Sequence, residues 1–309
     1  MKVFITGGTG FVGQNVALRL IKEGFEVTVL TRGRKMADKG PGLDLPYQGQ
    51  ISYLIGNPAE AGPWQEAISQ HQVIINLAGL SIFGRWTEKY KQEIRDSRIN
   101  ITRNLVAAMT CASSGAQTLL NASAIGYYGF SGEEEVTEES PPGSDFLASV
   151  CQAWEKEALA AERKGCRVVL MRFGLVLGKN GGVLDKLVPV FRKYLGGPLG
   201  SGGQWFSWIH VDDLIEAIIF LISKPDLRGP INICSPYPVR QKEFARSLGH
   251  ALKRPSFFRT PGFFLRLILG EMATVLVNGQ KAYPARLLNA GFNFQYPRID
   301  EALNQIIKS

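Results

Sequence analysis

Residues 6–13 of this 309-residue chain read TGGTGFVG, and this glycine-rich sequence gives the strongest indication of its fold. An apolar run, KVFIT, stands before it at 2–6, a helical pattern follows at 12–22, and the β-branched run EVTVLT lies at 26–31. Two strands that are joined through a helix pair in parallel. The unit therefore predicts a Rossmann-type turn, in which the pyrophosphate of a dinucleotide lies at the N-terminus of the helix.

The three glycines of this fingerprint have different tasks. Gly7 permits the tight turn, Gly10 lets the backbone approach the pyrophosphate, and Gly13 allows the helix to pack closely on the strand. The alternative is an ordinary tight turn without a ligand. The cofactor contacts that we expect on this turn are Gly7, Thr9, Gly10, Phe11, Val12 and Gly13.

The end of the second strand selects between cofactors. An NAD-dependent protein would carry Asp or Glu there for the ribose 2′-hydroxyl, but the chain reads TRGRK at 31–35. A guanidinium grips a 2′-phosphate through paired hydrogen bonds, whereas a carboxylate would repel it. Thr31 and Arg32 therefore predict NADP(H) rather than NAD(H), with Arg34 or Lys35 as an outer contact. The alternative is that these are solvated loop charges.

Apolar runs and helical patterns continue to alternate along the chain. The expected strands are 51–55, 73–77, 118–121, 167–172 and 230–234, and the expected helices are 64–70, 88–109, 149–164 and 212–223. Near-continuous apolar strands separated by helices are typical of a parallel sheet that is covered on both faces. The pattern predicts an α/β fold of the Rossmann type, with a doubly wound parallel sheet.

Two segments interrupt this alternation: residues 178–203 are rich in glycine, and residues 240–309 are mostly helical with prolines between the helices. Ligands of open α/β sheets lie outside the carboxyl ends of the strands, so we expect both segments to cover that edge. The expected domains are a dinucleotide-binding domain at 1–175 completed by 209–235, and a smaller, mostly helical C-terminal substrate lobe at 176–208 and 236–309.

Composition narrows the range of partners. The net charge is +8, yet no basic block is longer than residues 32–35, which favours a phosphate-bearing small ligand over nucleic acid. The four cysteines and three histidines are scattered, so we expect reduced thiols and no metal site. The acidic run at 133–139 is expected to be a solvated loop.

Nothing in the sequence points to a membrane. The most apolar stretch, 263–277, contains Arg266 and Glu271 and is too short to span a bilayer, so it predicts a buried or amphipathic helix. The N-terminus shows no signal-peptide pattern. We expect a cytoplasmic monomer or homodimer that acts on a small molecule, with no membrane or nucleic-acid partner.

Four motifs carry a family resemblance: residues 6–13, Asn76-Leu77-Ala78-Gly79 after a strand, Ser97-Arg98-x-Asn100 on the long helix, and His210-Val211-Asp212-Asp213. With them the chain resembles, over nearly its whole length, the extended short-chain dehydrogenase/reductase superfamily of the epimerase/dehydratase type. The segments 196–202, 204–210 and 270–273 resemble more narrowly the atypical, YfcH-like NAD(P)-dependent epimerase/dehydratase branch with its C-terminal domain.

This resemblance implies further cofactor contacts. Leu77, Ala78 and Gly79 should pass beside the adenosine ribose and the phosphates, and Ala122 and Val176 should lie near the nicotinamide. Arg98 should reach the cofactor from the long helix. For Arg98 the alternative is a surface ion pair with Glu93 or Asp96.

The catalytic residues of the superfamily are incomplete in this chain. Members usually use a serine and a Tyr-x-x-x-Lys pair, in which the tyrosine is the general acid or base and the lysine lowers its proton affinity. None of the nine tyrosines precedes a lysine by four residues. Phe146 or Leu147 stands at the tyrosine position, and Val150 or Cys151 at the lysine position. Ser123 is one residue from the usual serine position and is the candidate catalytic group.

The residues expected to line a substrate pocket are Trp86, Tyr128, Ser207, Trp208 and His210. For Tyr128 the alternative is packing at the mouth of the cleft, and for His210 it is a structural role at the junction of the lobes.

Three hypotheses for function remain. The first is an NADP(H)-dependent oxidoreductase or epimerase that acts on an unknown small carbonyl or hydroxyl substrate with a displaced or substrate-assisted acid/base. The second is a non-catalytic NADP(H)-binding sensor or scaffold, which the missing tyrosine and lysine favour. The third is binding of nucleic acid or a membrane surface through the basic surface.

Overall fold

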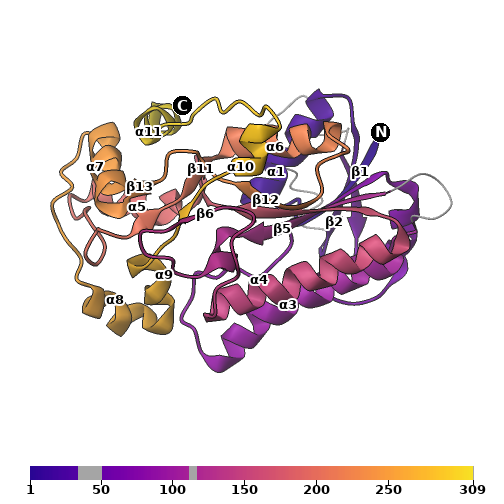
Figure 1. The fold of residues 1–309 in the computed structure, drawn as a ribbon, viewed down its shortest axis with the longest axis horizontal. Coiled ribbons are helices and arrows are strands. Elements are labelled where there is room, and N and C mark those ends of the chain that lie inside the picture. Colours follow the sequence, from indigo (N-terminus) through magenta and orange to yellow (C-terminus); the bar gives the residue numbers. More distant parts are fainter. Residues whose placement is uncertain (34–50, 111–116, 309) are drawn as a thin grey trace.

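The computed structural model describes residues 1–33, 51–110 and 117–308. At its centre is a seven-stranded parallel sheet in the order β12-β7-β5-β4-β1-β2-β3 (Figure 1). Its strands are β1 (Lys2–Thr6), β2 (Glu26–Thr31), β3 (Ile51–Ile55), β4 (Val73–Asn76), β5 (Thr118–Ala124), β7 (Arg167–Phe173) and β12 (Gly229–Ile233). This order, with helical crossovers between parallel strands, is that of a doubly wound Rossmann sheet, so the predicted fold class is confirmed.

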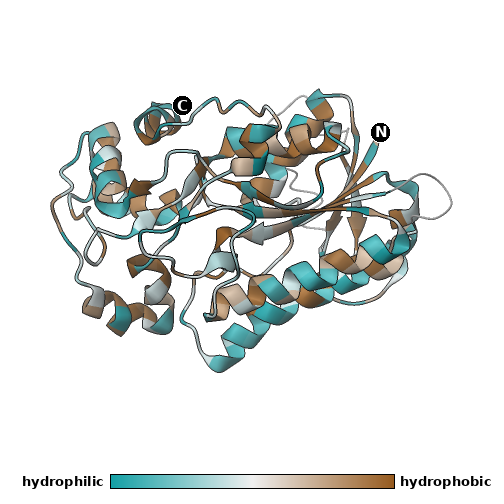
Figure 2. Cartoon of the chain, in the orientation of Figure 1, coloured by the Kyte–Doolittle hydropathy of each residue, from teal (hydrophilic) through white to brown (hydrophobic). Residues whose placement is uncertain are grey.

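Helices cover both faces of the sheet. The helices α1 (Phe11–Lys22) and α6 (Val211–Ser223) lie on one face, and α3 (Glu88–Ala108) and α4 (Phe146–Leu159) lie on the other (Figure 1). Successive side chains of a strand point to opposite faces, so β1 sends Val3 and Ile5 into one core and Phe4 into the other. Figure 2 shows hydrophobic strands between helices whose outer sides are hydrophilic.

The observed elements follow the predicted ones closely, and the differences have local causes. The helix expected at 149–164 begins earlier, because Asp145 caps it by accepting a hydrogen bond from Ala148 N at 3.0 Å. It ends as a 3₁₀ helix, η3 (Ala160–Lys164). The segment expected at 64–70 is the 3₁₀ helix η1 (Pro63–Gln70), and η2 (Ile125–Tyr128) follows β5 directly.

The rest of the chain is built from short elements. The helices are α5 (Leu184–Arg192), α7 (Gln241–Leu252), α8 (Gly262–Leu269), η4 (Gly270–Met272), α9 (Ala273–Val277), α10 (Ala285–Asn289) and α11 (Ile299–Lys308). Three small sheets, which the sequence did not predict, accompany them: β8 (Leu175–Gly178) with β9 (Gly181–Gly182) and β11 (Trp208–His210), β10 (Trp205–Phe206) with β13 (Val239–Arg240), and β6 (Glu135–Val136) with β14 (Lys281–Ala282).

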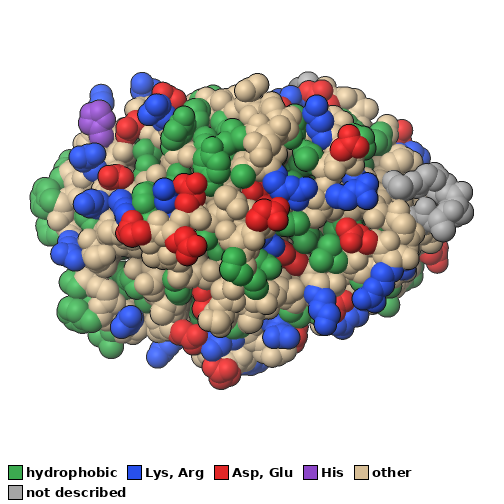
Figure 3. All heavy atoms as spheres, in the orientation of Figure 1, with side chains coloured by type: hydrophobic (Ala, Val, Ile, Leu, Met, Phe, Trp, Pro, Cys, Tyr) green, Lys and Arg blue, Asp and Glu red, His purple; other side chains and the backbone are tan. Residues whose placement is uncertain are grey.

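The apolar stretch 263–277 forms α8, η4 and α9. It is not buried as a whole, because Leu265 is buried while Phe263 and Leu267 are each 75% exposed. Among the described residues, no helix has the length and apolar character needed to cross a membrane. On the face drawn in Figure 3, basic and acidic side chains are interspersed.

Two expectations about polar residues need correction. Cys151 and Cys234 are free and buried, but Cys166 is disulfide-bonded, so not every cysteine is a reduced thiol; Cys111 lies outside the described residues. The acidic run is not wholly solvated either. Glu138 is buried and its Oε1 accepts hydrogen bonds from the backbone N–H groups of Asn232 (3.0 Å) and Arg286 (3.3 Å). This carboxylate therefore ties the acidic loop to β12 and α10.

Candidate functional site

The glycine turn joins β1 to α1 at the carboxyl edge of the sheet. Gly10 N donates to Gly7 O at 3.0 Å, and Gly7 has a φ of +73°, which glycine adopts without strain. A Cβ on Gly7 would lie 2.6 Å from the backbone carbon of Leu77. Gly10 is the N-cap of α1 and has no side chain, so it offers no side-chain acceptor to the first N–H groups of the helix. The turn thus has the shape and the free donors that a phosphate group requires.

A buried polar atom at the end of β2 also lacks a partner. Thr31 is 3% exposed, and its Oγ1 has no hydrogen-bond partner among the described residues. Buried hydroxyls are nearly always satisfied, so an orphaned one at this edge points to a ligand. Arg32 follows and is exposed. Arg34 and Lys35, the expected outer contacts, lie outside the described residues.

A cavity of about 420 Å³ extends along the same edge. The expected site residues that line it are Val12, Leu77, Arg98, Ala122, Ser123, Val176 and Ser207. The C-terminal part of the chain contributes Trp205, Val275 and Gln280, and Ser207 Oγ donates to Gln280 O at 2.8 Å. Residues from both ends of the chain therefore meet at this cavity.

The helix α4 presents apolar groups where the superfamily carries tyrosine and lysine. Leu147, Val150 and Cys151 line the cavity, whereas Phe146 packs against Trp86 with ring centroids 5.1 Å apart. Burial raises the pKa of the Cys151 thiol to about 11, so it stays protonated at neutral pH. These side chains give the cavity no acid/base pair on α4.

Ser123 belongs to a buried polar network. Its Oγ donates to Glu155 Oε1 at 2.7 Å, and Arg172 binds both oxygens of Glu155, each at 2.8 Å. The Arg172 Nη1 also donates to the Tyr128 hydroxyl at 2.9 Å, which donates in turn to Asn232 Oδ1 at 2.7 Å. Burial lowers the pKa of Arg172, but the hydrogen bonds and charge of Glu155 outweigh burial and raise it. The network joins β5, α4, β7 and β12.

The sequence analysis missed Glu155 and Arg172. One signal was available for Arg172, because it is the charged residue inside the otherwise apolar run 168–173 of β7. Charged side chains are rarely buried unless paired, so a partner was to be expected. Nothing local identified that partner as Glu155 on α4.

Arg98 of α3 lies in the cavity wall and is half-buried. Its Nη1 donates to Ile94 O at 2.9 Å, and its guanidinium carbon lies 5.2 Å from the centroid of the Trp154 ring. Among the described residues it forms no ion pair, so the alternative of a surface pair with Glu93 or Asp96 is wrong. Burial lowers the pKa of the Arg98 guanidinium, opposed weakly by nearby groups, none of which is a carboxylate.

Four residues that were expected to line the pocket do not lie in the wall of this cavity. Trp86 Nε1 donates to Ile82 O at 2.9 Å, and Tyr128 belongs to the polar network. Trp208 is fully buried and donates to Tyr237 O at 3.3 Å. His210 accepts from Asp212 N through Nδ1 at 3.1 Å and binds Gln305 Oε1 through Nε2 at 2.9 Å. Each side chain is held by packing or bonds elsewhere, and His210 joins α6 to α11.

The burial of His210 leads to a prediction about pH. Burial lowers the pKa of its imidazole from the ordinary 6.5, and Asp212, Gln305 and Asp213 oppose this shift. The ring is therefore protonated more readily in the unfolded chain than in the folded one. The contribution of His210 to the free energy of unfolding is present above about pH 6.5, and it is lost as the pH falls through the pKa that His210 has in the folded protein. We expect the free energy of unfolding in urea to fall between about pH 7.5 and about pH 5.5.

The variant His210→Asn isolates this contribution. Asparagine keeps an acceptor for Asp212 N at the helix N-terminus but does not titrate. Its free energy of unfolding should decline less over the same pH range. Subtracting one pH curve from the other cancels the contribution of the other titrating groups. Parallel curves for the two proteins would show that His210 is not the group responsible.

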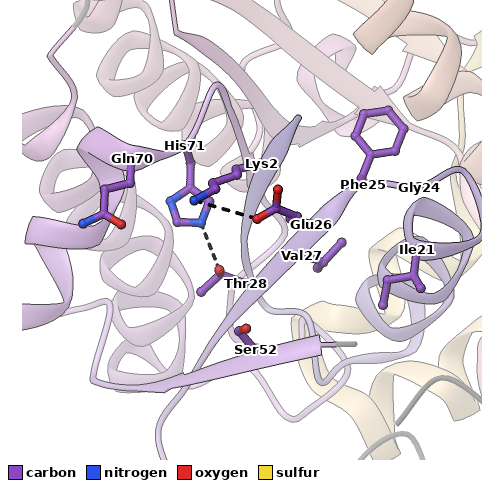
Figure 4. Close-up of a pocket in the computed structure, with 10 residues that line it drawn as sticks. All are labelled: Lys2, Ile21, Gly24, Phe25, Glu26, Val27, Thr28, Ser52, Gln70 and His71. Atoms are coloured by element: carbon purple, nitrogen blue, oxygen red, sulfur yellow. Dashed lines mark hydrogen bonds and ion pairs between the residues drawn. The ribbon is translucent and has the colours of Figure 1, made fainter. Parts of the chain in front are cut away.

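A second pocket lies at the opposite, amino-terminal edge of the sheet (Figure 4). There His71 Nε2 is hydrogen-bonded to Thr28 Oγ1 at 2.9 Å, and Lys2 Nζ lies 3.8 Å from Glu26 Oε2. These four polar side chains are thus paired with one another. Ligands of open α/β sheets bind at the carboxyl edge, so we place the candidate site there. Within the described ranges, no group of three His, Cys, Asp or Glu side chains could hold a metal.

The sheet order and the glycine turn define a protein of the Rossmann class. The family model described as "NAD dependent epimerase/dehydratase family" matches residues 3–234, and the chain belongs to this family. A second model, described as a domain of unknown function, matches residues 260–306 and so covers Val275 and Gln280 of the cavity wall. These matches confirm the resemblance that the sequence motifs indicated.

Relatives support the same assignment over the whole chain. "Epimerase family protein SDR39U1 homolog, chloroplastic" from Arabidopsis thaliana is 42% identical, with 100% of this chain and 87% of the relative covered. "Epimerase family protein YfhF" from Bacillus subtilis is 39% identical, with 99% and 98% covered. The crystal structure of human epimerase family protein SDR39U1 with NADPH superimposes with a TM-score of 0.85, at 30% identity and full coverage of both chains.

Proposed function

We propose that the chain binds NADP(H) at the glycine turn and acts as an oxidoreductase or epimerase on a small carbonyl or hydroxyl substrate. The observation that carries this proposal is that three features occur at the same edge of the sheet. They are the uncapped N-terminus of α1, the Thr31 hydroxyl, which has no hydrogen-bond partner among the described residues, and Arg32. The human relative of known structure contains NADPH. The bound cofactor would supply the hydride chemistry.

The proposed cofactor contacts are those expected from the sequence, apart from Arg98. The turn residues Gly7 to Gly13 and the first N–H groups of α1 hold the pyrophosphate, and Leu77, Ala78 and Gly79 pass beside the adenosine ribose. Thr31 and Arg32 hold the 2′-phosphate. Ala122 and Val176, which line the cavity, lie beside the nicotinamide.

The variant Arg32→Ala tests the choice of cofactor. A guanidinium that binds the 2′-phosphate contributes a charge-assisted contact, so NADPH should bind about tenfold or more weakly, while NADH affinity stays unchanged. Nucleotide fluorescence titrations measure both dissociation constants. Arg246→Ala, which removes an exposed arginine of α7, is the matched control. An unchanged NADPH-to-NADH ratio in Arg32→Ala would rule out this role of Arg32.

For the proton transfer we propose Ser123 with Glu155. Oxidation of a substrate hydroxyl needs an acceptor for its proton. Ser123 lines the cavity and donates its own proton to Glu155 Oε1, so its oxygen can accept the substrate's proton while the serine proton passes to Glu155. Reduction of a carbonyl runs the two transfers in reverse.

One observation favours a second candidate, a non-catalytic NADP(H)-binding sensor or scaffold. Leu147 and Cys151 line the cavity at the tyrosine and lysine positions, and neither exchanges a proton at neutral pH. A panel of aldehydes, ketones and oxo acids added to protein preloaded with NADPH separates the two. Loss of NADPH absorbance that Ser123→Ala abolishes, with NADPH affinity unchanged, supports the enzyme. No oxidation with any compound supports the sensor.

A further inference from the structure

The cavity contains a cation for which none of the described residues provides an anion. Arg98 contributes one hydrogen bond, to Ile94 O, and the remaining N–H groups of its guanidinium have no partner among the described residues. The side chain lies beside Gly79, where an added Cβ would come within 3.3 Å of its Cζ, and against Trp154. Gly79 therefore leaves the space that this guanidinium occupies.

Such an arrangement is costly in the absence of a ligand. Removing a guanidinium from water without an anionic partner disfavours the charged form, and burial accordingly lowers the pKa of Arg98. A stacking contact with one indole and one carbonyl hydrogen bond offset only part of this cost. Two other arginines with buried or half-buried side chains differ: Arg172 is paired with Glu155, and Arg167 is bonded to three backbone carbonyls.

We propose that Arg98 is the oxyanion receptor of this cavity and that the substrate is a small oxo acid or hydroxy acid whose carboxylate binds its guanidinium. A planar guanidinium matches a carboxylate through two parallel hydrogen bonds. The neighbouring wall is apolar, with Ile82, Ile94, Leu147 and Val150, so the rest of the substrate is apolar and compact.

The source of the anion follows from the proposed function, on which this inference rests. The cofactor's pyrophosphate has its site at the N-terminus of α1, and its 2′-phosphate has Arg32. The nicotinamide end, which lies beside Ala122 and Val176 in the same proposal, carries no anionic oxygen. The oxyanion for Arg98 therefore comes from the second ligand, which occupies the cavity that Ser123 also lines.

The test compares carboxylates with amides of nearly the same shape. Formate, acetate and benzoate, each against its amide, are titrated into protein with and without saturating NADP⁺. The variants are Arg98→Gln and Arg98→Lys, with Arg95→Gln, an exposed arginine of the same helix, as the matched control. NADPH affinity and the melting temperature of the unliganded protein are measured for each.

We expect the wild-type protein and Arg95→Gln to bind at least one carboxylate about tenfold or more tightly than its amide, and Arg98→Gln to lose this preference. Arg98→Lys should keep part of the preference for the carboxylate, because lysine still supplies a positive charge. Unliganded Arg98→Gln should melt no lower than the wild type, because it loses a charge without a partner. Its NADPH affinity should be unchanged.

Two results would overturn the proposal. One is a wild-type protein without preference for any carboxylate, or a preference that survives in Arg98→Gln. The other is a loss of NADPH affinity in Arg98→Gln without a carboxylate effect, which would assign Arg98 to the phosphates of the cofactor. Failure of NADPH to bind the wild-type protein would instead refute the proposed function, and the carboxylate titration without NADP⁺ still tests Arg98 by itself.

Discussion

The variant Gly13→Ala is expected to lose about 3 kcal/mol or more of its free energy of unfolding, because the new methyl group collides with the backbone. A Cβ on Gly13 would overlap Gly7 O and lie 2.6 Å from Gly8 Cα. These atoms belong to the turn itself and cannot move aside as a flexible side chain would. Accommodating the methyl group means pushing α1 away from β1. Urea unfolding, followed by circular dichroism, measures the loss.

Gly10→Ala is the matched control for this prediction. A Cβ on Gly10 would meet Gly7 O alone within 4 Å, at 3.3 Å, and the φ of Gly10 is an ordinary −82°. Its stability should stay within about 1 kcal/mol of the wild type. If the turn approaches a pyrophosphate as proposed, Gly10→Ala nevertheless weakens NADPH binding. Wild-type stability in Gly13→Ala would contradict the packing argument, and wild-type affinity in Gly10→Ala would contradict the place of the phosphates.

The sequence predicted the sheet well because its signals are local. The strands β1, β2 and β3 begin and end where their apolar or β-branched runs do, and their register follows from parallel pairing. The glycine turn carries its geometry in its spacing. The predicted helix began at residue 149, whereas α4 begins at Phe146, because its start depends on a single cap, Asp145, whose effect is visible only when the backbone is known.

The candidate site could be predicted only where backbone position decides it. Leu77 follows the end of β4, Ala122 lies in the last part of β5, and Val176 comes shortly after β7, so the carboxyl edge of the sheet brings all three to the cavity. Side-chain direction could not be predicted. Trp208 lies in a short strand and His210 caps the helix α6, and both side chains are buried in the core. Two short strand pairs and the packing of α11 on α7 depend on contacts between distant segments, which no local pattern encodes.

Arg98 shows that helix geometry could have decided one alternative in advance. Residues three or four apart face each other on a helix, whereas Asp96 is two residues and Glu93 five residues before Arg98. An ion pair with either was therefore disfavoured by the spacing alone. The position of the guanidinium beside Gly79 and Trp154 brings together three segments of the chain, and this required the structure.

The other large effect is expected for the buried pair of Glu155 and Arg172. Their side chains are 6% and 4% exposed, and the variant Glu155→Gln leaves the Arg172 guanidinium buried without a countercharge. Breaking a buried pair by removing one partner costs about 3–5 kcal/mol, since the remaining charge stays desolvated. Glutamine still offers Ser123 an acceptor oxygen, so the loss reports on the charge rather than on the serine hydrogen bond. Urea unfolding at neutral pH measures it.

The double variant Glu155→Gln/Arg172→Met distinguishes an uncompensated charge from a simple loss of contacts. With both charges gone, neither of these two positions holds a buried ion, so the double variant should be more stable than Glu155→Gln alone. The same helix supplies the control, because Glu157 pairs with Arg103 at 2.7 Å with side chains that are 27% and 57% exposed. Glu157→Gln should cost no more than about 1 kcal/mol. Equal losses for the two glutamates, or a double variant less stable than the single one, would show that the buried pair acts through packing and hydrogen bonds instead.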